Sequence, residues 1–281
     1  MKDPLERIAA ALERIAPAEN DPADWNSAPA YVWDGARPRA IARIAAPPFQ
    51  LLFGIDRQKH LVSENVARLA RGAAAHDMLL WGARGMGKSA LVRSATIAAQ
   101  ADASGALALV QVVPDALTML PALFSQLGAC GRSFLVYLDD LGFAEGDTVG
   151  PRHLRGWLEG GVDARPANVR LAVTSNRRAI VPRHGSEQDD PLNPRDALDD
   201  LQALADRFGL SIGFHAAGQD DYLAMVRGYA QSLGLDWDEA EALEWAKRRG
   251  ARSGRTAWQF ITELAGRAGL RIEGYSFVSR T

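Results

Sequence analysis

Residues 79–92 have the sequence LLWGARGMGKSALV, and this stretch decides the fold. An apolar run leads into a loop with three glycines, and the loop ends on Lys88 and Ser89. Gly82 to Ser89 match the pattern G-x-x-x-x-G-K-[ST]. Because glycine has no Cβ, the backbone can curl with its N–H groups directed at an anion. The stretch therefore predicts a strand, a phosphate-binding loop and a helix in succession.

Each polar residue of this loop has an expected task. Lys88 would neutralise the β and γ oxygens of a triphosphate, and the Ser89 hydroxyl would ligate Mg²⁺. A glycine-rich turn that matches the pattern by chance is the alternative, and the flanking strand and helix disfavour it. The residues expected to contact the nucleotide are Gly82, Ala83, Arg84, Gly85, Met86, Gly87, Lys88, Ser89 and Ala90.

The rest of the central sequence alternates short apolar runs with stretches of helix length. Nearly continuous apolar strands separated by helices are typical of a parallel sheet that is covered on both faces. We therefore expect a three-layer α/β P-loop core with a five-stranded parallel sheet over residues 47–216. Its strands would be 78–82, 106–113, 134–139, 169–175 and 210–216.

The two ends of the chain differ from this core. Residues 4–16 carry apolar side chains at helical spacing, and a stretch rich in Pro, Asp and Trp follows. Residues 1–46 are therefore expected to form an amphipathic helix and a linker. After His215 only helical spacing is found, so residues 217–281 are expected to form a small helical lid.

The composition of the 281 residues narrows the class of protein. A net charge of −2 gives no general attraction to nucleic acid, although local basic clusters could still bind it. The single cysteine excludes an intrachain disulfide framework. No apolar run reaches the roughly 18 residues of a membrane span, and acidic residues interrupt the N-terminal stretch where a secretory signal would be apolar. We expect a soluble cytoplasmic protein without membrane attachment.

A second candidate site lies in FLVYLDDLGF, residues 134–143, where an apolar run ends in Asp139 and Asp140. Ligands of open parallel sheets bind at the carboxyl ends of the strands, beside the phosphate loop. Asp139 would hold Mg²⁺ through water, and Asp140 would polarise the attacking water. A turn that simply favours aspartate is the alternative. The commoner pattern has Glu in second place, so hydrolysis could be slow; Glu145 is a weaker candidate for the same task.

Three further polar residues are candidates for sensing nucleotide. Asn176 follows a strand and could hydrogen-bond the γ-phosphate, although asparagine also suits such a turn. Arg207 could stabilise charge in a neighbouring subunit's site, and the alternative is a surface ion pair. Arg255, at the start of the last helix, could reach back to the nucleotide. For the basic residues before it, from Lys247 to Arg252, a solvated helix end is the simpler reading.

The order of these features resembles the AAA+ ATPases over roughly residues 47–268. More narrowly, LLWGARGMGKSALV, YLDDLGFAEGD, LADRFGL and SGRTAWQF resemble an uncharacterised bacterial group of predicted AAA+ ATPases with a domain-of-unknown-function label. The resemblance implies a Walker A loop at Gly82–Ser89, and a Walker B pair at Asp139 and Asp140. It further implies that Asn176 is sensor 1, Arg207 the arginine finger and Arg255 sensor 2.

The resemblance also implies ligands and partners. Members of the superfamily bind ATP or ADP with Mg²⁺, and Phe53, Gly54 and Ile55 would lie near the adenine. They commonly assemble as homo-oligomeric rings, often hexamers, with the nucleotide at the subunit seam.

Three functions remain open at this point. The leading one is an oligomeric, Mg²⁺-dependent ATPase whose hydrolysis moves the lid and remodels a protein partner. The second is an ATP-dependent DNA-binding or helicase-loader-like module with weak turnover, suggested by the short Asp140 and the basic run at residues 247–255. The third is an ATP-binding scaffold that changes its oligomeric state without catalysis.

Overall fold

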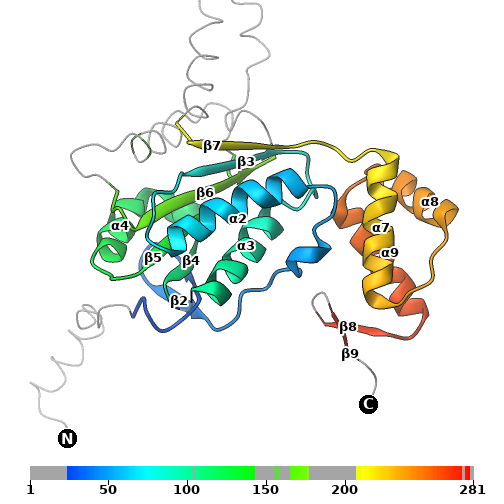
Figure 1. Ribbon diagram of the computed structural model, residues 1–281, viewed down its shortest axis with the longest axis horizontal. Coiled ribbons are helices and arrows are strands. Elements are labelled where there is room, and N and C mark those ends of the chain that lie inside the picture. The colour runs from blue at the N-terminus through cyan, green and yellow to red at the C-terminus, as the bar shows by residue number, and fades with distance from the viewer. Residues whose placement is uncertain are drawn as a thin grey trace, which may run out of the picture.

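A computed structural model of the chain describes residues 24–103, 105–142, 156, 158, 165–176, 207–273 and 276–278. In Figure 1 a layered α/β body occupies one side and a group of helices the other. The expected helix within residues 4–16 lies outside the described residues, and so does Glu145.

The five apolar runs form five neighbouring strands of one sheet, as the sequence predicted. They are β3 (Met78–Gly82), β4 (Leu107–Val112), β5 (Ser133–Leu138), β6 (Val169–Ser175) and β7 (Leu210–Phe214). Neighbouring members run parallel in the order β4-β5-β6-β3-β7. Because β3 lies inside the sheet and the chain crosses over two strands to reach β4, the loop after β3 opens at a point where the strand order reverses. Ligands of doubly wound sheets bind at such a point.

The sheet contains two strands that the sequence did not reveal. β1 (Ala30–Trp33) pairs in parallel with β4, and β2 (Pro38–Ile41) pairs antiparallel with β1, so the sheet has seven strands within the described ranges, where the sequence predicted five. This part of residues 1–46 is therefore not a linker. Its strands are only four residues long, but Trp25 anchors them through ring contacts with Tyr31 and Phe134.

Two hydrophobic cores lie on opposite faces of the sheet. Along β5 the side chains of Leu135 and Tyr137 enter one core, while Phe134, Val136 and Leu138 enter the other. This alternation follows from the period of two in an extended strand. α2 (Asp56–Ala70) and α3 (Lys88–Asp102) cover the first face together with the short η1 (Phe49–Leu51). α4 (Leu120–Gly128), after η2 (Pro114–Met119), covers the second.

The lid consists of three helices, α7 (Gln219–Leu233), α8 (Glu239–Arg249) and α9 (Gly254–Arg267). α7 and α8 end on Gly234 and Gly250, both in the left-handed conformation that closes many helices. α9 begins where its N-cap Ser253 accepts a hydrogen bond from the Thr256 amide. The lid is not purely helical, because β8 (Arg271–Glu273) and β9 (Ser276–Val278) pair antiparallel beyond α9.

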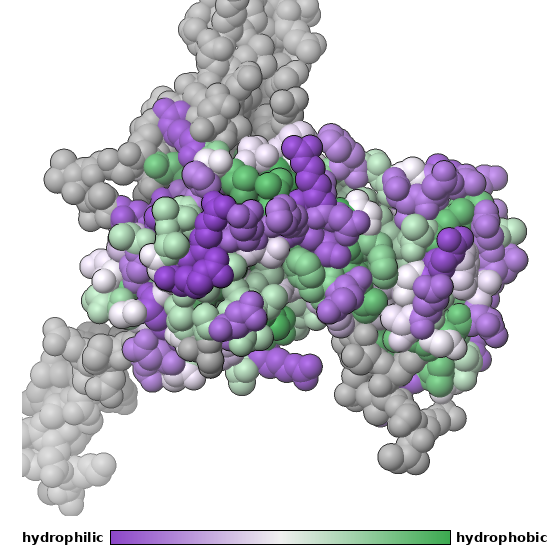
Figure 2. Space-filling view, viewed as in Figure 1, coloured by the Kyte–Doolittle hydropathy of each residue, from purple (hydrophilic) through white to green (hydrophobic). Residues whose placement is uncertain are grey.

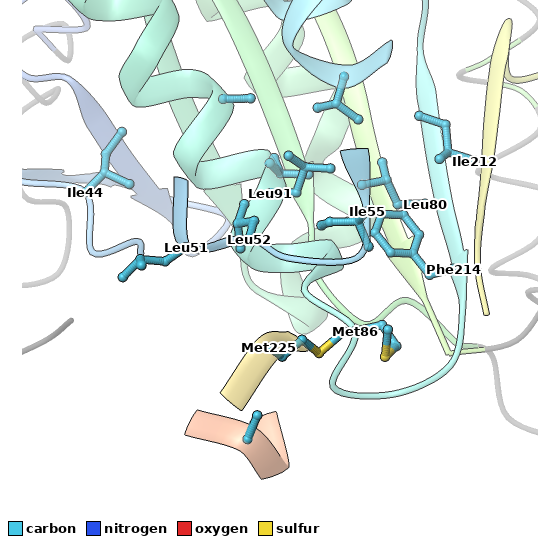
Figure 3. Packing of buried hydrophobic residues seen from close by; sticks show 14 of the residues in the cluster. Ile44, Leu51, Leu52, Ile55, Leu80, Met86, Leu91, Ile212, Phe214 and Met225 are labelled. Atoms are coloured by element: carbon cyan, nitrogen blue, oxygen red, sulfur yellow. The ribbon is translucent and has the colours of Figure 1, made fainter. Parts of the chain in front are cut away.

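The lid and the α/β body share one of the two hydrophobic cores. Figure 3 shows Met225 of α7 near Met86 of the phosphate loop, with Leu52 and Ile55 beside them. On the outside, hydrophilic side chains gather over α2, and hydrophobic ones show where the body meets the lid (Figure 2). Because the apolar contact is continuous, movement of the lid must displace side chains of the phosphate loop.

No helix within the described ranges is both long and apolar enough to cross a membrane.

Candidate functional site

The phosphate loop joins β3 to α3 through glycines in conformations that other residues rarely adopt. Gly85 and Gly87 have φ angles of +79° and +86°, and Gly87 is the N-cap of α3. The first N–H groups of an α-helix have no carbonyl partner within the helix, and the residues that carry them here, Lys88 to Ala90, line a cavity. This end of α3 also carries the positive pole of the helix dipole, so it suits an anion.

Lys88 is held at the centre of the loop although only 6% of its surface is exposed. Its Nζ donates hydrogen bonds to the carbonyl oxygens of Gly82 at 2.8 Å and Ala83 at 2.9 Å, and to Asn176 Oδ1 at 3.1 Å. Burial lowers the pKa of Lys88, and the carboxylates of Asp140 and Asp139 oppose that shift. An anionic phosphate bound beside the Lys88 ammonium would further stabilise its charged form.

Asp139 lies between α3 and the end of β6. Its Oδ1 accepts hydrogen bonds from the hydroxyls of Ser89 at 2.6 Å and Thr174 at 2.7 Å. Partial burial raises the pKa of Asp139, but these hydrogen bonds outweigh it, and the pKa falls below its ordinary value. The residue is therefore ionised at neutral pH. A carboxylate and a hydroxyl this close form the hard oxygen pair that Mg²⁺ prefers, so the residues fit that metal.

Asp140 is the one described non-glycine residue with a positive φ, at 54°. Its amide donates to Thr174 Oγ1 at 2.8 Å, which anchors the turn, and its carboxylate accepts a hydrogen bond from Asn176 Nδ2. Asn176 thus connects Lys88 on one side to Asp140 on the other. Strained backbone that is held by side chains is common where a group must be aimed at a reacting centre.

All of these groups face one cavity of about 280 Å³. The cavity contains the loop from Arg84 to Ala90, the carboxylates and Asn176, and it is also lined by Phe53 and Ile55. The backbones of Gly82 and Ala83 hold Lys88 from behind, while Gly54 and these two residues do not line the cavity.

The lid closes the cavity from the other side. The Arg255 amide donates to the Gly85 carbonyl at 3.1 Å, and a Cβ at Gly85 would come within 2.8 Å of Ser253 Oγ. Arg255 also lines the cavity, and its charge contributes to lowering the pKa of Lys88. Rings of Phe53, Tyr229 and Trp258 make successive edge-on contacts at 5.6 and 5.3 Å, which forms an aromatic wall.

Arg207 lies away from this cavity. It precedes β7, and the register pairs Leu210 with Met78 at the start of β3, whereas Phe214 pairs with Gly82 beside the loop. Four strand steps, roughly 13 Å, separate those two ends of the sheet. Arg207 is therefore not brought together with the cavity residues of its own chain.

The basic residues at the end of α8 have neighbours within the lid. Arg248 forms an ion pair with Glu244 at 3.1 Å. The Arg249 guanidinium lies over the Trp245 ring and donates to Gln259. These contacts agree with a solvated, helix-stabilising role for this part of the basic run.

Several cavity residues were missed in the sequence. Thr174, which hydrogen-bonds both residues of the Asp139 and Asp140 turn, is a polar side chain directly after the apolar residues 171–173 of β6, and that contrast could have marked it. Arg93 falls four residues after Ser89, one helical turn away on the same face. The lid residues Met225, Tyr229 and Trp258 carry only the apolar spacing of any packed helix, so no local signal separates them from core.

The mostly parallel sheet, the loop after β3 and the C-terminal helices match the fold of the AAA+ cores of RuvB and DnaA. Over residues 26–268 the chain matches the model of the family described as "Protein of unknown function (DUF815)", and it belongs to that family. A comparison with curated proteins finds no match.

Solved structures support the same fold at low identity. The RuvB Holliday junction branch migration motor of Thermotoga maritima gives a TM-score of 0.51 at 14% identity, over 80% of this chain and 67% of that one. Aeropyrum pernix Orc1, solved in complex with DNA, gives 0.51 at 15% identity, over 82% and 66%. Domain III of the Thermotoga maritima replication initiation protein DnaA gives 0.50 at 14% identity, over 80% and 91%. At such identities the likeness concerns the fold alone.

Proposed function

We propose that this protein binds ATP with Mg²⁺, hydrolyses it slowly and works as an oligomer whose lid motion remodels a protein partner. The observation that carries the proposal is the Asn176 side chain, which joins Lys88 to Asp140 inside the cavity that the lid closes. The amide can exchange these partners for a phosphate oxygen or a water. Binding of a γ-phosphate would then change the hydrogen bond between Asn176 and Asp140.

The residues divide the chemistry between them. Lys88 and the first amides of α3 bind the β and γ oxygens, and Ser89 and Asp139 would hold Mg²⁺. When bound, the metal neutralises phosphate charge and orients the oxygens for displacement. Asp140 accepts a proton from the attacking water, and Asn176 orients that water or the γ-phosphate. Phe53 and Ile55, which also line the cavity, would contact the adenine ring.

The lid supports coupling between hydrolysis and motion. Arg255 is joined to the phosphate loop by its backbone and lines the cavity with its side chain, so loss of the γ-phosphate changes the forces on α9. Met225 and Tyr229 carry the same displacement to α7. A lid of this kind converts the state of the nucleotide into a change of its angle to the body.

Replacing Asp140 with asparagine should lower steady-state phosphate release by roughly 100-fold or more, the usual contribution of a general base. Nucleotide affinity should change by no more than a few-fold, because asparagine can still bond to Asn176. Phosphate release and nucleotide titration measure the two effects. The exposed Asp56→Asn serves as control. Unchanged turnover in Asp140→Asn would assign the base to another carboxylate and contradict this role.

The placement of Arg207 predicts complementation between subunits. Arg207→Ala and Lys88→Met should each be inactive alone, whereas mixed oligomers contain seams with both an intact loop and an intact arginine. The ATP turnover of the mixture should therefore exceed that of either variant alone. It should pass through a maximum as the ratio of the two variants is changed. Light scattering with and without ATP would follow assembly in the same samples. If no ratio restores turnover although mixed oligomers form, the arginine does not act in trans.

A further inference from the structure

Arg93 is a cation in the cavity that the proposed chemistry has not used. It lies on α3 one turn beyond Ser89, is only partly exposed and lines the same cavity. Its Nε is buried, and no hydrogen-bond partner for it exists among the described residues. A buried guanidinium N–H without an acceptor costs free energy, so a charged group placed in this way at a cavity wall favours an anionic ligand.

The neighbouring carboxylate of Asp139 does not form an ion pair with Arg93. Asp139 is near enough for the arginine to lower its pKa, but its Oδ1 is already engaged by the Ser89 and Thr174 hydroxyls. No ion pair joins the two residues within the described structure. Tyr137 also interacts with Asp139 and Arg93. Burial and the Asp139 charge raise the pKa of its phenol, so Tyr137 is neutral and supplies no anion.

The direction of the side chain points to a ligand. Helical side chains lean toward the N-terminus of their helix, so Arg93 extends back over the turn of Ser89 and Ala90. Both residues of that turn line the same cavity, and amides in the first turn of a helix have no carbonyl partner within the helix. Lys88 and Asn176 lie at the γ-phosphate end, and the aromatic wall lies at the base end. Ser89 and Ala90, which follow Lys88 in the first turn of α3, line the same cavity, and we place the α-phosphate beside them.

We propose that Arg93 binds the α-phosphate of the nucleotide directly. The inference rests on the proposed nucleotide site and adds a contact common to di- and triphosphates. The Arg93 guanidinium would donate hydrogen bonds to the α-phosphate oxygens, and the backbone amides of the first turn of α3 would donate to the same phosphate. Because the contact is to the ligand and not through Asp139, it does not depend on Mg²⁺.

The test measures binding of ADP and of a non-hydrolysable ATP analogue by calorimetry, each with Mg²⁺ and with EDTA. The Arg93→Met variant keeps the buried stem and removes the charge, and Arg93→Lys keeps the charge. Arg57→Met, an exposed arginine on α2, is the matched control. Thermal unfolding of each variant without nucleotide verifies that it is folded.

We expect Arg93→Met to weaken both nucleotides equally, by about 10-fold or more, with and without Mg²⁺. Arg93→Lys should recover part of the affinity, and Arg57→Met should behave as wild type. A loss seen only with Mg²⁺ would show that Arg93 acts through Asp139, and a loss confined to the triphosphate would place it at the γ-phosphate. Either result, or unchanged affinity, overturns the inference. If wild type binds neither nucleotide, the proposed function itself fails.

Discussion

Replacing Lys88 with methionine should weaken ATP binding and reduce turnover by roughly 100- to 1,000-fold, as expected for removal of a preorganised charge from a phosphate site. The ammonium is fixed before the ligand arrives, because two carbonyl oxygens and Asn176 hold it in place. ATP can therefore contact the Lys88 charge without the entropy cost of ordering a flexible side chain on binding.

The same variant should not lose stability without nucleotide. Burial lowers the pKa of Lys88 in the folded protein below its unfolded value of 10.5, so the protonated side chain costs folding free energy at neutral pH. That cost diminishes as the pH rises through the folded-state pKa. Methionine removes it while filling most of the space. Urea unfolding at pH 7 should therefore give a free energy of unfolding equal to or above that of wild type.

Nucleotide titration together with unfolding separates these effects. Lost binding with retained stability is the expected pattern. Binding and turnover comparable to wild type in a folded Lys88→Met would contradict the assignment of the phosphate site.

Replacing Gly82 with alanine should destabilise the protein by about 3 kcal/mol or more, because backbone strain and a steric clash combine. Gly82 has a φ of +118°, and an added Cβ would lie 2.1 Å from the Phe214 carbonyl oxygen. That oxygen accepts a hydrogen bond from the Ala83 amide at 2.7 Å, so it cannot withdraw without opening the end of β7. The strand would have to part from β3 where the phosphate loop begins.

Gly72→Ala is the matched control. Gly72 also has a positive φ, at +69°, but nothing lies within 4 Å of the added Cβ, so only the left-handed backbone opposes the change. We expect it to cost about 1 kcal/mol. Chemical denaturation of both variants measures the difference. Equal stability of the two would show that β7 can move away from Gly82 at little cost, and would argue against a rigid sheet edge behind the loop.

Much of the core could be predicted from the sequence because its signals are local. The glycines and Lys88 follow one another in a single loop, and the apolar runs of the five central strands are each continuous. Asp139 and Asn176 could be placed near that loop because parallel strands end at the same edge of the sheet. β1 and β2 could not, since the apolar run of β1 is only four residues long and that of β2 is interrupted by Arg39; pairing with β4 and the ring contacts of Trp25 hold them in place.

The finer construction of the site depends on contacts between residues that are far apart in the chain. Thr174 and Asp139 come from different strands, and the amide of Arg255 reaches Gly85 across the boundary between lid and body. A polar residue in a strand or an apolar one in a helix has the same local pattern whether it lines a cavity or fills a core. Only packing distinguishes the two.

The sequence by itself determined that a phosphate loop lies between a buried strand and a helix, with carboxylates ending a second strand and a mainly helical lid following. Such features are encoded by residue type and spacing over short stretches. The tertiary structure decided that Lys88, Asn176 and Asp140 form one connected chain, that Arg207 lies at the far end of β7 and that the Arg93 Nε is buried without a hydrogen-bond partner among the described residues. These facts follow from strand order and side-chain direction, which exist only once the chain has folded.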